Sequence, residues 1–336
     1  MNWYLQNGKD SDVVLSSKVC LSRNIKGIPF TTKASQEELK KVYSLMKDAS
    51  NSLGYGLRFF DLSDMDEITR DSLAEKHLIS KAHSKSKQKY SAIILNDDES
   101  ICIEVNEEDH IKIQVFRSGL ELESITNLAI ELDEKIGKIL PYSYHKQYGY
   151  LTACPTNVGT GMKVSTIVHL PALSITRNTR KLLNVVNNFG MEIKGLYGDG
   201  SKVEGDLYQI SNNQTLGVTE KEIVKSLNLI TNKVIEQERT ARKYLTRQSI
   251  DLEDKVYRDF GILTNARKIN LNEALKLLSN VKLGVDLGII KELNDSKVSE
   301  LMLYIKPANL QKRVGKELTI NEQSIERAKI VKEMCN

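Results

Sequence analysis

The sequence predicts an α+β fold in two parts, a domain with a largely antiparallel sheet flanked by helices and then an all-helical domain. Short runs in which apolar and polar residues alternate occur in the first part, and such alternation is typical of strands with one buried face. Beyond about residue 250, the periodic segments have helical spacing and show no strand signal. We therefore place the two domains at residues 13–245 and 250–336.

The composition narrows the classes of protein to which this chain can belong. Hydrophobic residues make up 40% of the 336 residues, which is enough for a sizeable buried core. The 48 Lys and Arg residues nearly balance the 44 Asp and Glu residues, and no basic block indicates nucleic-acid binding. No stretch approaches the roughly 20 apolar residues that span a bilayer, and no signal peptide is visible, so we expect no membrane association.

The cysteines favour a reducing compartment. Cys20, Cys102, Cys154 and Cys335 lie far apart and form no CxxC pair. This spacing argues against a zinc site or a disulfide framework. We therefore expect a cytoplasmic protein that has no metal site of its own.

The first elements run from a strand to a lysine-rich loop. A strand begins at Val13, and Ser35 with Glu38 forms a capping box that starts an amphipathic helix. Residues 61–80 are weakly helical, and residues 81–89 are polar and lysine-rich. We expect residues 81–89 to form an exposed loop.

Residues 91–117 are predicted to form three strands with one apolar face. The apolar side chains fall on odd positions, namely Ile101, Ile103, Val105, Ile111, Ile113 and Val115. Successive strand residues point to opposite faces, so the even positions are free for chemistry. If this alternation continues through the intervening NEED segment, Glu108 points toward a site, whereas Glu107 and Asp109 point away from it.

The remaining elements are mostly helical. Helices are expected over about 119–139, ended by Pro141, over 173–189, capped by Gly190, and from a capping box at Thr219 and Glu222 to about Tyr244. A last strand is expected at 208–211. The second domain shows helical spacing over residues 251–260, 271–280, 296–304 and 321–334.

The stretch from Gly149 to Leu173 contains the most unusual local chemistry. It has the order strand, glycine-rich loop, strand. Gly159 and Gly161 would let backbone N–H groups approach an anion, and Lys163 follows where a phosphate would need a cation. The alternative interpretation is a tight turn before a buried strand.

These residues carry a resemblance to a known family. The loop sequence CPTNVGTG, followed by a basic residue and a strand ending in HLP, resembles the signature of the guanidino phosphotransferases, which include creatine and arginine kinases. Further segments match in the family's order, namely VVLSSKVCLSRNIKGIPF (13–30), EKHLIS (75–80), NEEDHIKIQ (106–114), IKGLYGDGS (193–201) and YQISNNQTLGVTE (208–220). The resemblance implies the family's catalytic fold, with ATP as phosphate donor and Mg²⁺ carried by the nucleotide.

The chemistry of a guanidinium acceptor requires a base. Its pKa is above 12, so transfer to its nitrogen needs a group that orients it and accepts a proton. The resemblance gives this role to Glu108 and implies that Asp199 helps to hold the guanidinium. By the same resemblance, the substrate loops include Cys154, Asn157, Gly159, Gly161 and Gly198. For an EED triplet taken alone, the ordinary interpretation is a solvated acidic turn.

The nucleotide positions depart from the family. The resemblance implies that Ser17 and His77 contact the nucleotide, and that five arginines clamp its phosphates. At the five arginine positions this chain has Lys18, Cys20, Lys112, Lys163 and Lys194. Lysine keeps the charge but lacks the planar fork of arginine, and cysteine removes the charge. Two alternatives therefore stay open: an active kinase, or a weak or inactive one that serves as a binding or regulatory adaptor.

Within the family, the chain most resembles the bacterial protein arginine kinases. The small-substrate kinases place a helical domain before the first matching segment, which begins here at residue 13, so we expect protein substrates with exposed arginines. The resemblance also implies a homodimer, a link to stress response and protein quality control, an activator protein and a Clp-type protease. Only Arg327 and Ala328 match the subfamily's phosphoarginine-binding motif, so we doubt that a regulatory pocket at these residues still binds phosphoarginine.

Overall fold

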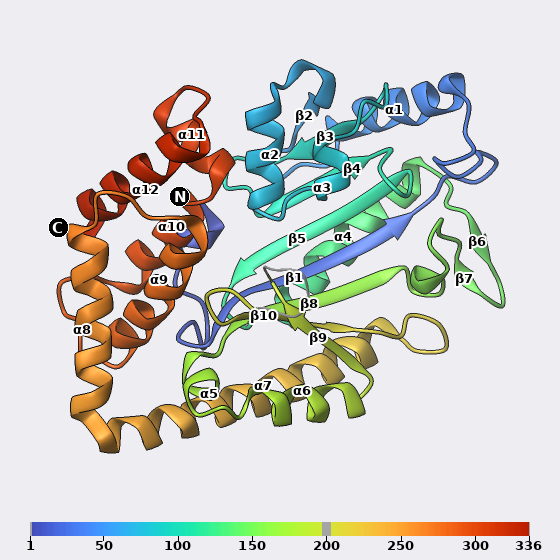
Figure 1. Cartoon of the computed structure of the whole chain (residues 1–336). Coiled ribbons are helices and arrows are strands. Elements are labelled where there is room, and N and C mark those ends of the chain that lie inside the picture. Colours follow the sequence, from blue (N-terminus) through green and yellow to red (C-terminus); the bar gives the residue numbers. More distant parts are fainter. Residues whose placement is uncertain (1, 197–202, 336) are drawn as a thin grey trace.

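The first domain is organised around an eight-stranded sheet in which every neighbouring pair is antiparallel. The computed structural model describes residues 2–196 and 203–335, and in these residues the strand order is β2-β3-β4-β5-β1-β8-β10-β9. The strands are β1 (Val14–Arg23), β2 (Arg58–Asp61), β3 (Ala92–Leu95), β4 (Ile101–Val105), β5 (Ile111–Ser118), β8 (Met162–His169), β9 (Met191–Gly195) and β10 (Leu207–Asn212). A separate hairpin pairs β6 (Tyr144–His145) with β7 (Gly149–Tyr150) and projects from one end of the sheet (Figure 1).

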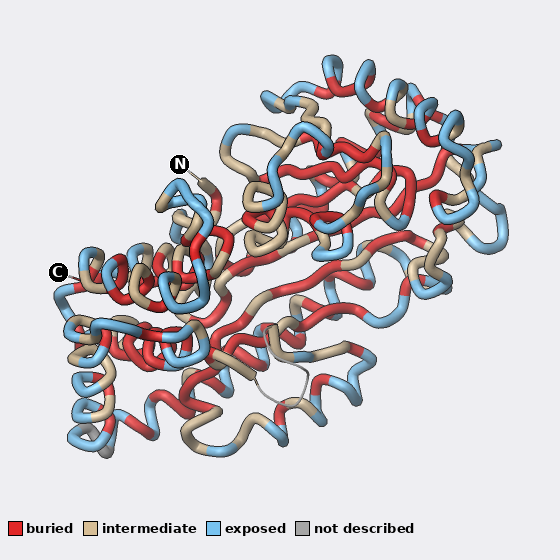
Figure 2. Tube along the Cα trace, turned by 45° about the horizontal axis from the view of Figure 1, so that its top comes forward, coloured by how far each residue is buried: buried red, intermediate tan, exposed pale blue. Residues whose placement is uncertain are grey.

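Helices cover one face of this sheet more completely than the other. The large core packs the odd-numbered side chains of β4 and β5 against α1 (Gln36–Ser50), α4 (Leu122–Ile139) and α7 (Glu220–Leu245). On the opposite face, α2 (Glu67–Glu75) and the segment after it cover β3, β4 and β5 through a smaller cluster that includes Leu73, Leu78 and Phe116. The central strands are buried, whereas the outer helices present exposed residues to solvent (Figure 2).

The second domain consists of helices over its described residues. These are α8 (Ser249–Asn265), α9 (Leu271–Asp286), α10 (Asp295–Tyr304), α11 (Pro307–Val314) and α12 (Ile320–Cys335). A 3₁₀ turn at Thr246–Gln248 separates α8 from the end of α7. The α+β fold predicted from the sequence is confirmed, as are the capping boxes that begin α1 and α7.

Buried ion pairs join the two domains at α7 and α9. Arg242 lies 2.9 Å from Glu238 on its own helix and 3.2 Å from Asp286 on α9. Lys282 lies 3.1 Å from the same Asp286 carboxylate. The charges of this junction thus have partners on both sides, as burial of charges requires.

The structure differs from the predicted elements in several places. Lys81–Ser84 form a short helix, α3, inside the segment expected to be an exposed loop. The single helix expected over 173–189 is divided into α5 (Pro171–Ile175) and α6 (Thr179–Asn188), because Arg177 has a left-handed backbone with a φ of 57°. The edge strands β2 and β9 have no counterpart among the predicted strands.

No helix in the described residues is long and apolar enough to cross a membrane.

Candidate active site

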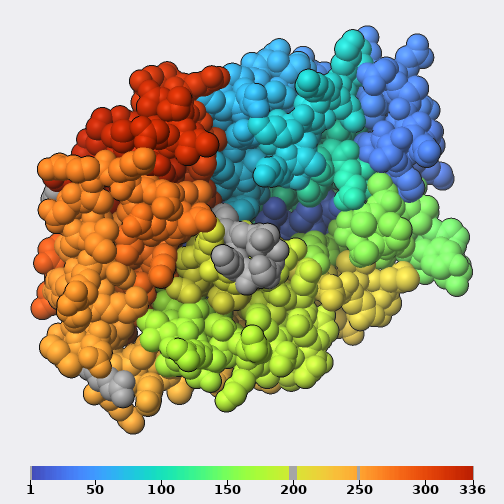
Figure 3. Space-filling view, viewed as in Figure 1, coloured from blue at the N-terminus to red at the C-terminus, as the bar shows by residue number. Residues whose placement is uncertain are grey.

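Basic side chains from four strands share the less covered face of the sheet. Strand register places Cys20 directly between Gln114 of β5 and Lys163 of β8, and it places Lys18 beside Phe116 and Ser165. Lys112 on β5 pairs with Ser22, and Lys194 on β9 pairs with Gln209. The five positions predicted to form a phosphate clamp, at residues 18, 20, 112, 163 and 194, therefore lie on one face. In the space-filling view this face is a recess with β1 at its floor (Figure 3).

Lys112 is neutralised by carboxylates. Its Nζ atom lies 3.2 Å from Glu104 on β4 and 3.5 Å from Glu107. Glu104 is fully buried, and its carboxylate also lies 2.6 Å from His83 Nδ1 and accepts a hydrogen bond from Gln114 at 2.9 Å. Burial alone would raise the pKa of Glu104, but Lys112 and His83 lower it to about 2. Burial would lower the pKa of Lys112, yet Glu104 holds it above its ordinary value.

Lys163 and Lys194 share one carboxylate. Glu192 on β9 lies 3.7 Å from the Nζ atom of Lys163 and 3.8 Å from that of Lys194. These side chains are 38% to 56% exposed, so the pairs are accessible to water and to a competing anion. Lys163 also donates a hydrogen bond to the Asn212 carbonyl oxygen.

Lys18 and Cys20 lie at the centre of the face. The Lys18 ammonium donates to the His77 carbonyl oxygen at 3.2 Å and lies 4.9 Å from the centre of the Phe116 ring. Burial lowers the pKa of Lys18. Burial also raises the pKa of the Cys20 thiol, so this position contributes no charge to the predicted phosphate clamp.

The acidic turn between β4 and β5 does not keep the predicted alternation. Asn106 has a φ of 55°, which lies outside the extended conformation of a strand, so the two-residue alternation is interrupted there. The condition on which Glu107 was expected to point away is therefore not met, and its carboxylate accepts a hydrogen bond from Ser80 Oγ at 2.7 Å and lies near Lys112.

Glu108 lies in the same turn and is exposed. Partial burial, and then the neighbouring charges of Asp109 and Glu107, raise the pKa of the Glu108 carboxyl. A carboxylate with a raised pKa is a stronger proton acceptor. The predicted position of Glu108 on the strand face is thus replaced by a position on a turn at the end of that face.

Asp109 joins this turn to the glycine-rich loop. Its Oδ1 atom accepts hydrogen bonds from Asn24 Nδ2 at 2.6 Å and from the Ala153 backbone N–H at 2.7 Å. Asn24 also donates to the Leu151 carbonyl oxygen at 3.0 Å. The acidic turn and the loop that begins near Cys154 are therefore held side by side.

The loop glycines are required by close backbone packing. A Cβ atom at Gly159, which has a φ of 116°, would lie 2.2 Å from the Thr215 carbonyl oxygen. A Cβ atom at Gly161 would lie 2.7 Å from the Ser22 carbonyl oxygen. The Gly159 N–H donates to the Tyr150 carbonyl oxygen, so this group is already used within the protein. These contacts support the tight-turn interpretation of Gly159 and Gly161. Cys154 directly precedes the 3₁₀ helix Pro155–Asn157, and Asn157 is its last residue.

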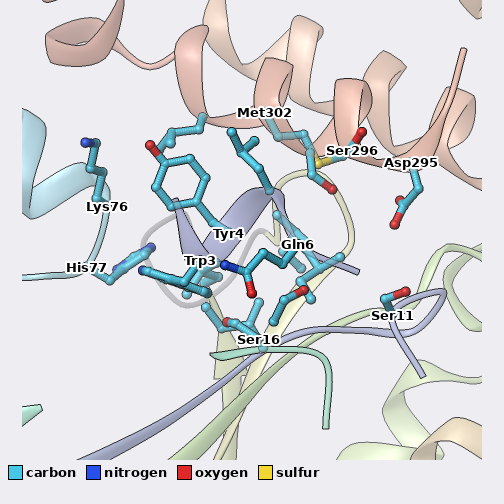
Figure 4. Close-up of a pocket in the computed structure, with 18 of the residues that line it drawn as sticks. Trp3, Tyr4, Gln6, Ser11, Ser16, Lys76, His77, Asp295, Ser296 and Met302 are labelled. Atoms are coloured by element: carbon cyan, nitrogen blue, oxygen red, sulfur yellow. The ribbon is translucent and has the colours of Figure 1, made fainter. Parts of the chain in front are cut away.

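His77 lies where two cavities meet. The larger, of about 750 Å³, is lined by Lys18 and Lys112 on the sheet and by residues of α2 and the second domain. The smaller, of about 120 Å³, is mostly apolar and is bounded by Trp3, Tyr4 and Ser16 (Figure 4). Desolvation lowers the pKa of His77 well below its ordinary value, so its ring is neutral at pH 7.

Other predicted site residues lie apart from this group. The Ser17 hydroxyl donates to the Gly119 carbonyl oxygen at 2.7 Å, on the face of β1 opposite to Lys18. Ser16, which sequence reasoning did not select, lines the smaller cavity instead. Gly198 and Asp199 fall outside the described residues.

The predicted regulatory residues are part of the packing of the second domain. Arg327 is 2% exposed and donates to the carbonyl oxygens of Ile305 at 2.7 Å and Ile269 at 3.0 Å. Ala328 is also buried. The described residues contain no group of three or more His, Cys, Asp or Glu side chains arranged to hold a metal ion.

Comparisons with known proteins show the family to which this chain is related. Residues 37–241 match the family described as ATP:guanido phosphotransferase, C-terminal catalytic domain, and residues 249–336 match the Protein-arginine kinase McsB C-terminal domain. The chain is 45% identical to a protein-arginine kinase of Halothermothrix orenii, over 100% of this chain and 96% of the relative. It is 40% identical to a protein-arginine kinase of Bacillus subtilis, over 99% and 92% of the two chains.

Solved structures of guanidino kinases also align with most of the chain. The duplicated taurocyamine kinase of Schistosoma mansoni, with bound transition-state analogue components, aligns with a TM-score of 0.62 and 27% identity. That alignment covers 70% of this chain and 34% of the duplicated enzyme. A lombricine kinase aligns with a TM-score of 0.60 and 23% identity, over 70% and 68% of the chains, and supports the fold.

Proposed function

The chain belongs to the ATP:guanido phosphotransferases, and we propose that it transfers the terminal phosphoryl group of ATP to arginine side chains of proteins. The relatives that match over the whole chain are named protein-arginine kinases, which favours a protein-borne acceptor. The observation that carries the proposal is the position of the acidic turn at the end of the lysine-bearing face. Glu107 of this turn lies 3.5 Å from Lys112.

In the proposed reaction, the lysine-bearing face and the acidic turn have different roles. Lysines of the face bind the phosphates of Mg-ATP, which carries its own metal ion. As the new N–P bond forms and the bond to the leaving ADP oxygen breaks, Glu108 accepts the proton that the guanidinium loses. The raised pKa of Glu108 suits it to this role.

The cavities provide a place for the rest of the nucleotide. The apolar cavity beside His77 is suited to an uncharged heterocycle, whereas the larger cavity presents Lys18 and Lys112. Since the cavities share His77, a nucleotide can place its base in the first and its phosphates in the second. We propose this orientation for ATP.

A second candidate is a weak or inactive enzyme that acts as an adaptor. Three of the four clamp lysines lie within 4 Å of carboxylates, namely Lys112 near Glu104 and Glu107, and Lys163 and Lys194 near Glu192. Negative charge beside these lysines opposes phosphate binding. Cys20 adds no compensating charge, so this observation favours low nucleotide affinity.

One experiment separates the candidates. The purified protein is incubated with Mg-ATP and an arginine-rich unfolded protein, and acid-labile phosphoarginine is measured by mass spectrometry. Label that disappears in Glu108→Gln, while Mg-ATP affinity is kept, supports the kinase. No label from the natural chain, together with label from a variant carrying arginine at residues 18, 20, 112, 163 and 194, supports the adaptor.

We also propose the wider setting that the resemblance implies. It comprises action in the cytoplasm, homodimer formation through the second domain, and a link to stress response through an activator protein and a Clp-type protease. Light scattering with size-exclusion chromatography tests the dimer, because a monomeric mass at micromolar concentration would contradict it.

A further inference from the structure

The second domain is docked against the helix that precedes His77. The Glu75 carboxylate, at the end of α2, accepts hydrogen bonds from the backbone N–H groups of Ala308 at 2.8 Å and Asn309 at 2.9 Å. It also accepts one from the Asn309 side chain at 2.8 Å. These N–H groups belong to the first turn of α11, which has no internal partners for them. Glu75 of the first domain therefore caps a helix of the second.

This docking places Lys306 in the wall of the nucleotide cavities. Lys306 is the residue before α11, is 7% exposed and donates from Nζ to the Glu75 carbonyl oxygen at 2.7 Å. It lines both the larger and the smaller cavity, as do Glu75, His77 and Leu196. Lys306 thus lies at the junction where the proposed orientation puts the sugar and the first phosphates.

Lys306 and Lys18 approach His77 from different domains. Lys18 on β1 donates to the His77 carbonyl oxygen, whereas Lys306 donates to the carbonyl oxygen of Glu75, two residues earlier. Desolvation is the main cause that lowers the pKa of His77, and the positive charges of Lys306 and Lys18 lower it further. Two ammonium groups are therefore close to one imidazole at the same junction.

We propose that Lys306 is a phosphate-binding residue of the nucleotide site, so that the site is completed by the second domain. The proposal rests on the proposed binding of ATP. Cys20 removes a positive charge from the sheet, and carboxylates lie beside Lys112, Lys163 and Lys194. Lys306 supplies positive charge to the larger cavity from the second domain, and lysine binds phosphate as a point charge without fixed fork geometry. The residue lies outside the matched catalytic domain, which ends at residue 241.

The test compares ligands that differ in phosphate number. Isothermal titration of the full chain with Mg-ATP, Mg-ADP and adenosine is repeated for Lys306→Met and Lys306→Arg. The matched control is Lys312→Met, which removes an exposed lysine from α11, the helix that Lys306 precedes. Thermal denaturation of each variant verifies that it is folded.

We expect Lys306→Met to weaken Mg-ATP and Mg-ADP binding about tenfold, as the loss of a charged hydrogen-bond donor does. Adenosine affinity should stay the same, Lys306→Arg should restore most of the nucleotide affinity, and Lys312→Met should bind like the natural chain. Equal Mg-ATP affinity in Lys306→Met and the natural chain would overturn the inference about Lys306 but not the proposed function. An equal loss for Mg-ATP and adenosine would also overturn it, because it would indicate a structural role. Failure of the natural chain to bind Mg-ATP would overturn the proposed function together with this inference.

Discussion

The Glu104 carboxylate on β4 lies 3.2 Å from the Lys112 ammonium on β5, and the Glu104 side chain is completely buried. The pair sits at the edge of the cationic face, where it fixes the position of Lys112 and offsets its charge. Its partner His83 comes from α3, so the pair also attaches that short helix to the sheet. One carboxylate therefore affects both the stability of the domain and the charge of the site.

Replacement of Glu104 by Gln should destabilise the protein by about 3 kcal/mol, because it removes the buried carboxylate charge that is paired with Lys112 and His83. Urea denaturation followed by circular dichroism measures this change. Glu131→Gln is the matched control, since it breaks an exposed pair with Lys135 and should change stability little. Equal effects of the two substitutions would contradict the assignment of Glu104 as a structural carboxylate.

The low pKa of Glu104 predicts an acid-dependent loss of stability. The pKa of Glu104 is about 2 in the folded protein against an ordinary value of 4.5, so the unfolded chain binds the proton more readily. The stabilisation by the carboxylate is complete above about pH 4.5 and is lost as the pH falls toward about 2. The difference in unfolding free energy between the natural chain and Glu104→Gln should therefore shrink across this interval. A difference that is constant from pH 6 to pH 3 would refute the prediction.

The sequence predicted the sheet of the first domain better than its site. Alternation at Ile101, Ile103 and Val105 gave the buried face correctly, because strand geometry enforces a period of two. The alternation failed at the acidic turn, where the left-handed Asn106 redirects Glu107 toward Lys112. A single backbone angle of this kind has no periodic signal in the sequence.

Other site residues were missed because their contacts are long-range. Like Lys112, Glu104 has an even residue number, and in the strand pattern this indicates that its side chain faces the site. His83 lies in a helix of four residues, which is too short to show helical spacing. Lys306 reaches the cavities through an interface between residues 231 positions apart, and nothing near it in the sequence indicates that contact.

Removal of the Glu192 charge should strengthen nucleotide binding if the proposed function holds. Glu192 lies 3.7 Å from Lys163 and 3.8 Å from Lys194, so a phosphate has to compete with its carboxylate. Glu192→Gln should lower the dissociation constant of Mg-ATP about two- to fivefold, which corresponds to the energy of partly exposed pairs. The gain should diminish in high salt, because salt screens exposed charges.

The control for this prediction is Glu236→Gln, which removes the same charge from an exposed position on α7, the helix that packs on the opposite face of the sheet. Titration calorimetry at low and high salt measures all three proteins. Tighter binding in both variants would attribute the effect to net charge rather than to Glu192.

Loss of the Glu75 carboxylate should loosen the second domain at α11. Gln keeps the length of the side chain but has only one acceptor oxygen for the N–H groups of Ala308 and Asn309, so one of them loses its charged partner. Glu75→Gln should cost about 1–2 kcal/mol of stability, as the loss of a helix cap does. Hydrogen exchange monitored by mass spectrometry should show faster exchange in a peptide that covers residues 307–311. Asp66→Ala, which removes the cap at the other end of α2, should leave exchange in that peptide unchanged. If both substitutions accelerate it equally, the cause is general destabilisation of α2, and Glu75 is not the specific link between the domains.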